Sequence, residues 1–128
     1  MPKNLLRQST ALVRSQFFNL DNGSGTTVDE PLFRTGSRPV RIIGVYAIYG
    51  EATQTVASAN FKLGSAAGGA QYVAATAYEN TKAVGDTTSA TLVTDYVPAN
   101  SVVFVRHTGV ASTQTGTASI CVEIAYDE

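Results

Sequence analysis

His107 and Cys121 are the residues with the most obvious chemistry, since they are the only histidine and the only cysteine among 128 residues. Asp95 and Ser101 are imaginable partners for them in a catalytic triad. No nucleophile elbow or cysteine-protease signature surrounds any of these residues, and a working site demands close mutual geometry. We therefore expect that the protein is not an enzyme. We also expect His107 to lie at the surface beside a turn.

Metal and phosphate sites are equally poorly supported by the sequence. One histidine and one cysteine cannot complete a zinc site without carboxylates or other subunits. Asp21–Gly25 lacks the alternating acidic ligands of an EF-hand, and Gly64–Gly69 lacks the Lys-Ser/Thr ending of a phosphate-binding loop. We expect no metal and no cofactor, a tight turn at the first segment and a flexible hairpin loop at the second.

Tyrosine rings offer a weaker possibility, the stacking of sugars. The chain has six tyrosines and no tryptophan, and all six fall in predicted strands, where packing or an interface uses them equally well. These residues are Tyr46, Tyr49, Tyr72, Tyr78, Tyr96 and Tyr126.

The elements that carry these residues alternate between apolar and polar positions, which is typical of β-strands. LVTDYV and VVFVRH flank the turn Pro98–Ser101, so two strands are favoured there over one helix. Asn22-Gly23 takes positive φ readily and predicts the first hairpin corner.

Val40–Tyr49 is the most apolar stretch and is expected to be a central strand, because apolar residues cover both of its faces. Strict alternation puts Ile43, Val45, Ala47 and Tyr49 on one face and Ile42, Tyr46 and Ile48 on the other. The same alternation puts Cys121 on one face with Glu123 and Ala125.

The whole pattern predicts an all-β chain, a single-domain antiparallel β-sandwich that is jelly-roll-like and has about eight strands. Residues 19–128 would form the sandwich, and residues 1–18 an N-terminal arm or an edge strand. Besides strands at residues 17–20 and 40–49, we expect strands at residues 26–33, 56–63, 70–78, 90–97, 102–108 and 117–126.

The net charge, the lengths of the apolar runs and the cysteine content limit the classes of protein to which the chain could belong. The net charge of -1 is too small for nucleic-acid binding by bulk electrostatics, and no apolar run is long enough to cross a membrane. Arg7 and Arg14 interrupt any signal-peptide core, and a lone cysteine favours an intracellular assembly site. Residues 1–50 hold six Lys/Arg and three Asp/Glu, whereas residues 51–128 hold three and seven, so identical copies could attract one another.

Short side chains dominate, since Ala, Thr, Gly and Ser supply 54 of the 128 residues. Such a surface suits contact with other subunits. Four segments have a composition of the same kind: MPKNLLRQSTALVRSQFF, NFKLGSAAGGAQYVAATAY, DYVPANSVVFVRHTG and SICVEIAY. In this composition and in these segments, the chain resembles the small β-sandwich virion proteins of tailed bacteriophages, especially head decoration (cement) proteins.

That resemblance implies a structural protein that is assembled in the host cytoplasm. It would bind the major capsid protein on the outside of the phage head, commonly as a homotrimer, and would stabilise the capsid lattice. It also implies a contact site in the N-terminal arm, in which basic residues meet acidic capsid surface and apolar residues fill grooves. The basic residues would be Lys3, Arg7 and Arg14, and the apolar ones Leu5, Leu6, Leu12, Val13, Phe17 and Phe18.

Two alternatives remain open. One is a carbohydrate- or receptor-binding module that uses the loops Gly64–Gly69 and Gly109–Gly116 with nearby tyrosines, although the missing tryptophan counts against it. The other is a virion component of the tail or neck, which the sequence does not distinguish from a head protein.

Overall fold

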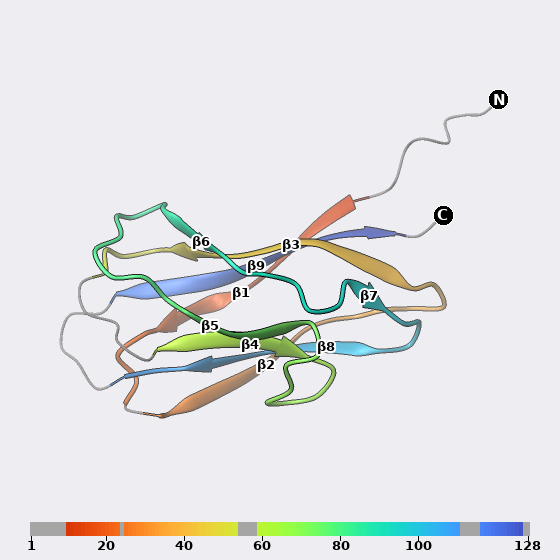
Figure 1. The fold of residues 1–128 in the computed structure, drawn as a ribbon, viewed down its shortest axis with the longest axis horizontal. Helices are drawn as coiled ribbons and strands as arrows, with labels where there is room; N and C mark the ends of the chain where they lie inside the picture. The colour runs from red at the N-terminus through yellow and green to blue at the C-terminus, as the bar shows by residue number, and fades with distance from the viewer. Residues whose placement is uncertain (1–9, 24, 54–58, 111–115, 127–128) are drawn as a thin grey trace.

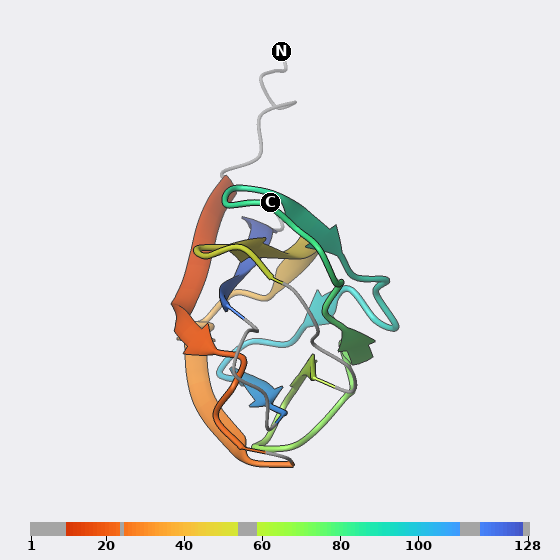
Figure 2. The same ribbon diagram turned by 90° about the vertical axis from the view of Figure 1, so that its left-hand side faces the viewer.

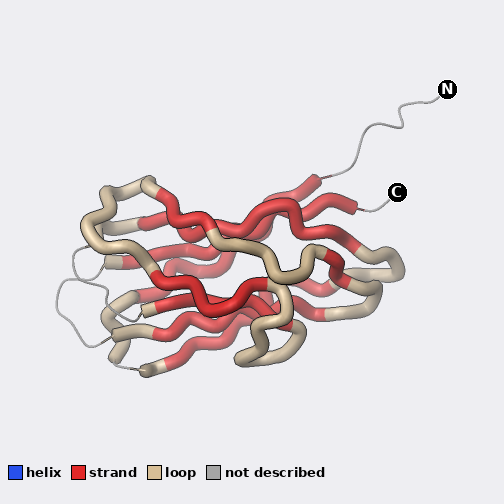
Figure 3. The backbone as a smooth tube through the Cα atoms, viewed as in Figure 1, coloured by secondary structure: helices blue, strands red, loops and turns tan. Residues whose placement is uncertain are grey.

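The computed structural model describes residues 10–23, 25–53, 59–110 and 116–126, and these form strands joined by loops and turns (Figure 3). The described part of the chain holds no helix that could span a membrane. Its nine strands are β1 (Thr10–Asn19), β2 (Thr27–Arg34), β3 (Val40–Tyr49), β4 (Asn60–Gly64), β5 (Val73–Ala77), β6 (Thr87–Ser89), β7 (Tyr96–Val97), β8 (Val102–Thr108) and β9 (Thr117–Tyr126).

The strands form two antiparallel sheets packed face to face (Figures 1 and 2). The first sheet has the order β1-β9-β3-β6, with the short β7 also pairing with β3, and the second has the order β2-β8-β4-β5. In each sheet a strand from the C-terminal end of the chain lies between two from the N-terminal half: β9 between β1 and β3, and β8 between β2 and β4. If β7 is left out, this is the strand order of an eight-stranded jelly roll. The predicted antiparallel β-sandwich is therefore confirmed.

Alternation along the strands builds the core between the sheets. In β8, Val103, Val105 and His107 are fully buried, and the residues between them are partly exposed. In β9, Ile120 and Val122 meet them from the first sheet. Burying each such aliphatic side chain stabilises the fold by about 1.5–3 kcal/mol, so this strip holds the two layers together.

β3 has the predicted bounds and lies between β9 and β6, which confirms its central position. The predicted division of its faces is wrong at one point, because the pairing with β9 shifts between Ile42 and Gly44. Ile43 is the extra residue of this β-bulge and is 54% exposed, while Ile42 turns into the core beside Ile124. A bulge opposes two residues to one and so breaks strict alternation.

The chain turns after β1, at Asp21–Gly23, but the prediction of a hairpin there is wrong. β1 pairs with β9 in the first sheet, whereas β2 pairs with β8 in the second. The turn therefore carries the chain from one layer to the other. The turn Pro98–Ser101 does the same between β7 and β8, and Asn100 there has a φ of 57°.

The predicted strand at residues 90–97 is wrong over most of its length. The short β6 pairs with β3 before this segment begins, and then Leu92 forms a bridge with Val73 of the second sheet. Tyr96 and Val97 return to the first sheet as β7. The segment changes sheets instead of continuing in one, and so closes one side of the sandwich.

Candidate interaction surface

His107 is fully buried, so the prediction that it lies at the surface is wrong. Its ring stacks on Phe18, with 5.0 Å between centroids, and its Nε2 lies 3.2 Å from the carbonyl oxygen of Asn19. Since a carbonyl only accepts, Nε2 carries the proton, and Nδ1 accepts a hydrogen bond of 2.9 Å from the hydroxyl of Tyr78. Burial lowers the pKa of His107 to about 4, so the ring is neutral at pH 7.

The other imagined triad members have different partners. Asp95 forms an ion pair of 3.0 Å with Arg41, and the backbone N–H of Ser101 donates to the hydroxyl of Thr35. Cys121 is 2% exposed, and burial raises the pKa of its thiol. Within the described residues, no cluster of three or more His, Cys, Asp and Glu side chains could hold a metal ion.

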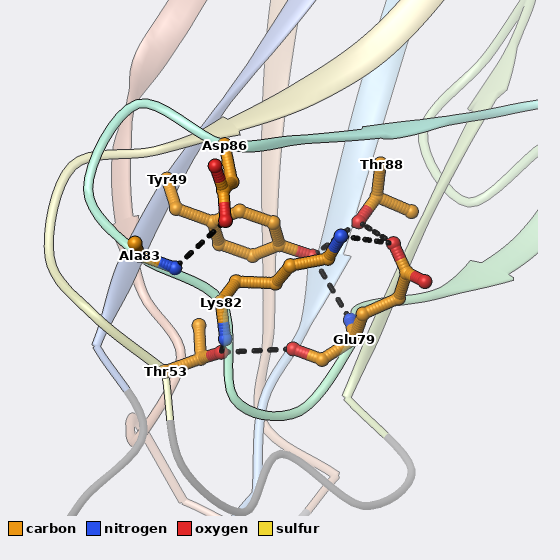
Figure 4. Close-up of polar contacts among 7 residues, drawn as sticks. All are labelled: Tyr49, Thr53, Glu79, Lys82, Ala83, Asp86 and Thr88. Carbon is orange, nitrogen blue, oxygen red and sulfur yellow. Dashed lines mark hydrogen bonds and ion pairs between the residues drawn. The ribbon is translucent and has the colours of Figure 1, made fainter.

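A closed ring of hydrogen bonds ties the connection between β5 and β6 to β3 (Figure 4). The N–H of Glu79 donates to the Tyr49 hydroxyl, which donates to Thr88 Oγ1, and Thr88 in turn donates to the Glu79 carboxylate. The bond from Thr88, helped by Lys82, lowers the pKa of the Glu79 carboxyl. Each hydroxyl proton has a partner, so the ring serves to hold the loop.

The loop Gly64–Gly69 joins β4 to β5, as predicted for a hairpin. Gly68 has a φ of 78°, and a Cβ there would lie 2.9 Å from the Arg106 guanidinium. That guanidinium makes two hydrogen bonds, of 2.8 and 2.7 Å, to Asp29 and holds the pKa of the Asp29 carboxyl below its usual value. The glycines let the loop lie close over this ion pair.

Exposed apolar side chains gather instead on the solvent side of the first sheet. In the described residues, seven large apolar side chains are exposed, of which five belong to strands of the first sheet and none to the second. Solvent-exposed apolar surface that is concentrated on one face is typical of an interaction site. We call this side the outer face; it comprises Leu12, Arg14 and Phe17 of β1, Ile43, Tyr46 and Ile48 of β3, and Cys121 and Glu123 of β9.

The strand register arranges these residues in rows across the sheet. One row runs from Leu12 through Glu123 to Gly44, and the next runs from Arg14 through Cys121 to Tyr46. A third runs from Phe17 through Ser119 to Ile48. Leu12 and Phe17 are 50% and 48% exposed, and the Arg14 guanidinium lies 5.8 Å from the centroid of the Phe17 ring.

Of the nine residues predicted as a contact site, the structure brings Leu12, Arg14 and Phe17 together on the outer face. Val13 and Phe18 point the other way and pack into the core. Lys3, Leu5, Leu6 and Arg7 lie outside the described residues. The sequence reasoning missed Ile43, Tyr46 and Ile48, although apolar residues on both faces of residues 40–49 were the available signal.

Three tyrosines of the suggested sugar platform are core residues. Tyr49, Tyr72 and Tyr78 are 1%, 4% and 4% exposed. Tyr96 and Tyr126 are 41% and 39% exposed and lie on β7 and β9. The loop residues 111–115 of the suggested sugar site lie outside the described residues.

Comparison with known proteins gives one informative match. No protein-family model and no curated protein matches the chain. A solved structure described as "Cyanophage Pam1 capsid asymmetric unit" contains a chain that superposes with a TM-score of 0.65, at 13% sequence identity. The alignment covers 100% of this chain and 91% of that one. The two chains share a fold.

Proposed function

We propose that the protein is a structural component of a bacteriophage virion, a decoration protein that binds the outside of the capsid. The observation that carries this proposal is the full-length likeness in fold to a chain of a phage capsid. That chain is itself short, since this one spans 91% of it. Jelly rolls recur in viral capsids, which adds support from the fold class.

The outer face is the surface that we assign to capsid binding. It combines the exposed apolar side chains of Leu12, Phe17 and Ile43 with Arg14 and Glu123. Aromatic residues and arginine are enriched in protein interfaces. Ile43 is its most exposed apolar residue and projects from a bulge, so it is suited to fill a pocket on a partner. Many copies that bind only the assembled lattice would stabilise that lattice by mass action.

The test is co-sedimentation of the purified protein with expanded capsids of the phage that encodes it. Ile43→Glu should weaken binding by about tenfold or more, because it places a charge in an apolar contact. Val93→Glu is the matched control, since Val93 is 62% exposed but lies in a loop away from the outer face. Both variants should melt within a few degrees of the wild type, as surface substitutions do.

Failure of the wild type to sediment with capsids would refute the decoration role. Equal loss of binding in both variants would refute the assignment of the outer face. Binding to isolated tails would instead support the alternative role as a tail or neck component. The homotrimer implied by the resemblance stays a prediction, and it competes with a two-fold dimer of this chain.

A further inference from the structure

We propose that β1 is a pairing edge for a second copy of this chain. Two copies would join β1 to β1 in antiparallel fashion about a two-fold axis at Val13, and Arg14 of each copy would reach Glu123 of the other. The pairing is independent of capsid binding and can be tested on the protein alone.

β1 presents an open edge. It ends the first sheet, and no other strand in the described part of the chain pairs with its outer side. The N–H of Gln16 bonds to the Glu30 carboxylate at 3.4 Å, so the available segment is Thr10–Ser15. In Figure 2 the red β1 forms the upper left margin of the molecule, and the orange β2 forms the lower left margin.

The edge at β2 is blocked by more features than the edge at β1. β2 contains Pro31, which has no N–H, the charged pair Asp29 and Glu30, and a register shift beside Pro31. Proline, charge and bulges are the usual means of blocking a sheet edge. β1 has a register shift of its own between Arg14 and Phe17. The segment before that shift, Thr10–Arg14, keeps a regular register and has one charge, no proline and a half-exposed leucine, so it retains the capacity to pair.

The register makes the edge self-complementary in charge. Leu12 lies opposite Glu123 in the native sheet. If Val13 meets Val13 of the second copy, Arg14 of that copy lies opposite Leu12, in the same row as Glu123. Its Cα is then two strand spacings, about 10 Å, from the Cα of Glu123, which the two long side chains together can span. Symmetry provides this contact twice.

Both charges lack an ion pair in the monomer as far as the described residues extend. Arg14 stacks on Phe17 and contacts the Cys121 thiol, and the Glu123 carboxylate lies against Gly44, 2.9 Å from where a Cβ would stand. Each is therefore ready to accept a partner of opposite charge. The interaction would fix the pairing register as well as favouring association.

Edge pairing would also extend the outer face. Joining two sheets edge to edge leaves their solvent sides in one continuous surface, so Ile43 and Phe17 of both copies would point in the same direction. A dimer could then bind a repeating lattice at two sites, with an affinity gain from the second contact.

The experiment is the absolute mass in solution by light scattering after size exclusion, over a micromolar concentration series. The wild type should show twice the chain mass of 13.4 kDa. Arg14→Glu and Glu123→Arg should each weaken dimerisation by about tenfold or more, equivalent to about 1.4 kcal/mol. The double variant, which exchanges the two charges, should restore it, and Arg34→Glu on β2 should leave it unchanged.

A monomer or a trimer at all these concentrations would overturn the proposal. So would a dimer that both single variants leave intact, or a double variant that remains monomeric although its melting temperature matches that of the wild type. Because no capsid is present, these outcomes are separate from a failure of capsid binding.

Discussion

At the scale of single residues, a buried neutral histidine joins the two layers. His107 of the second sheet stacks on Phe18 of the first and donates to the carbonyl of Asn19, while Tyr78 occupies its other nitrogen. Burial favours the neutral form because a charge would lose its hydration without gaining an anion. The folded chain therefore resists protonation of this ring.

Acid should weaken the fold through His107. Its pKa is about 4 in the folded chain and near 6.5 when unfolded, so the unfolded chain takes up the proton first. Stability should fall as the pH drops from about 6.5 to about 4, by up to about 3 kcal/mol, and this contribution should then level off. Urea unfolding of the wild type and His107→Gln at pH 7 and pH 4.5 checks this, since the variant should lose much of the difference between the two pH values.

Removing the hydroxyl of Tyr78 should cost stability at pH 7. Tyr78→Phe leaves Nδ1 of the buried ring without a donor, which should lower the free energy of unfolding by about 1–3 kcal/mol. Tyr96→Phe is the control, because Tyr96 is 41% exposed. Equal effects of the two substitutions in urea titrations would contradict the role given to the Tyr78 hydroxyl.

At the scale of elements, glycine decides how closely the loop after β4 can fold back. Gly64 is buried, and a Cβ there would lie 2.3 Å from the backbone carbon of Gly69. Gly36 has no atom within 4 Å of the same position. Substitutions at these two glycines therefore distinguish a position that needs glycine for close backbone approach from a position where glycine only adds flexibility.

Gly64→Ala should destabilise the chain by about 2 kcal/mol or more, since backbone has to move to admit the methyl group. Gly36→Ala should be neutral or slightly stabilising, because alanine restricts the unfolded chain without meeting an obstacle. Melting temperatures by circular dichroism check both. A Gly64→Ala variant as stable as Gly36→Ala would show that the loop can shift freely.

The sequence predicted the long elements and missed where the chain changes layers. Val40–Tyr49 and Thr117–Tyr126 carry enough period-two pattern to set their bounds. The turn at Asn22-Gly23 predicts a reversal equally well within a sheet or between sheets, so local chemistry could not exclude a hairpin. The bulge at Ile43 depends on the pairing of β3 with β9, which involves residues about eighty positions apart in the chain.

The candidate site was only partly predictable for a related reason. Leu12, Arg14 and Phe17 were chosen for composition, but the inward direction of Val13 and Phe18 depends on how β1 pairs with β9. For His107 the signal was present, because it continues the buried alternation of Val103 and Val105. As a polar residue beside a predicted turn, it was nevertheless expected at the surface.

At the scale of the whole molecule, the two solvent sides of the sandwich differ in character. Each sheet carries an ion pair, Arg41–Asp95 on the first and Arg106–Asp29 on the second, but among the described residues only the first sheet also carries exposed large apolar side chains, such as Leu12, Phe17 and Ile43. A subunit that lies flat on a capsid would place the first sheet inward and the second toward solvent.

Cryo-electron microscopy of capsids incubated with the purified protein would show whether the chain binds the capsid through its first sheet. We expect sandwich-shaped density on the outside of the capsid at repeated lattice positions, with β1, β3 and β9 toward the shell. A capsid surface without added density, or density in which the second sheet faces the shell, would contradict it.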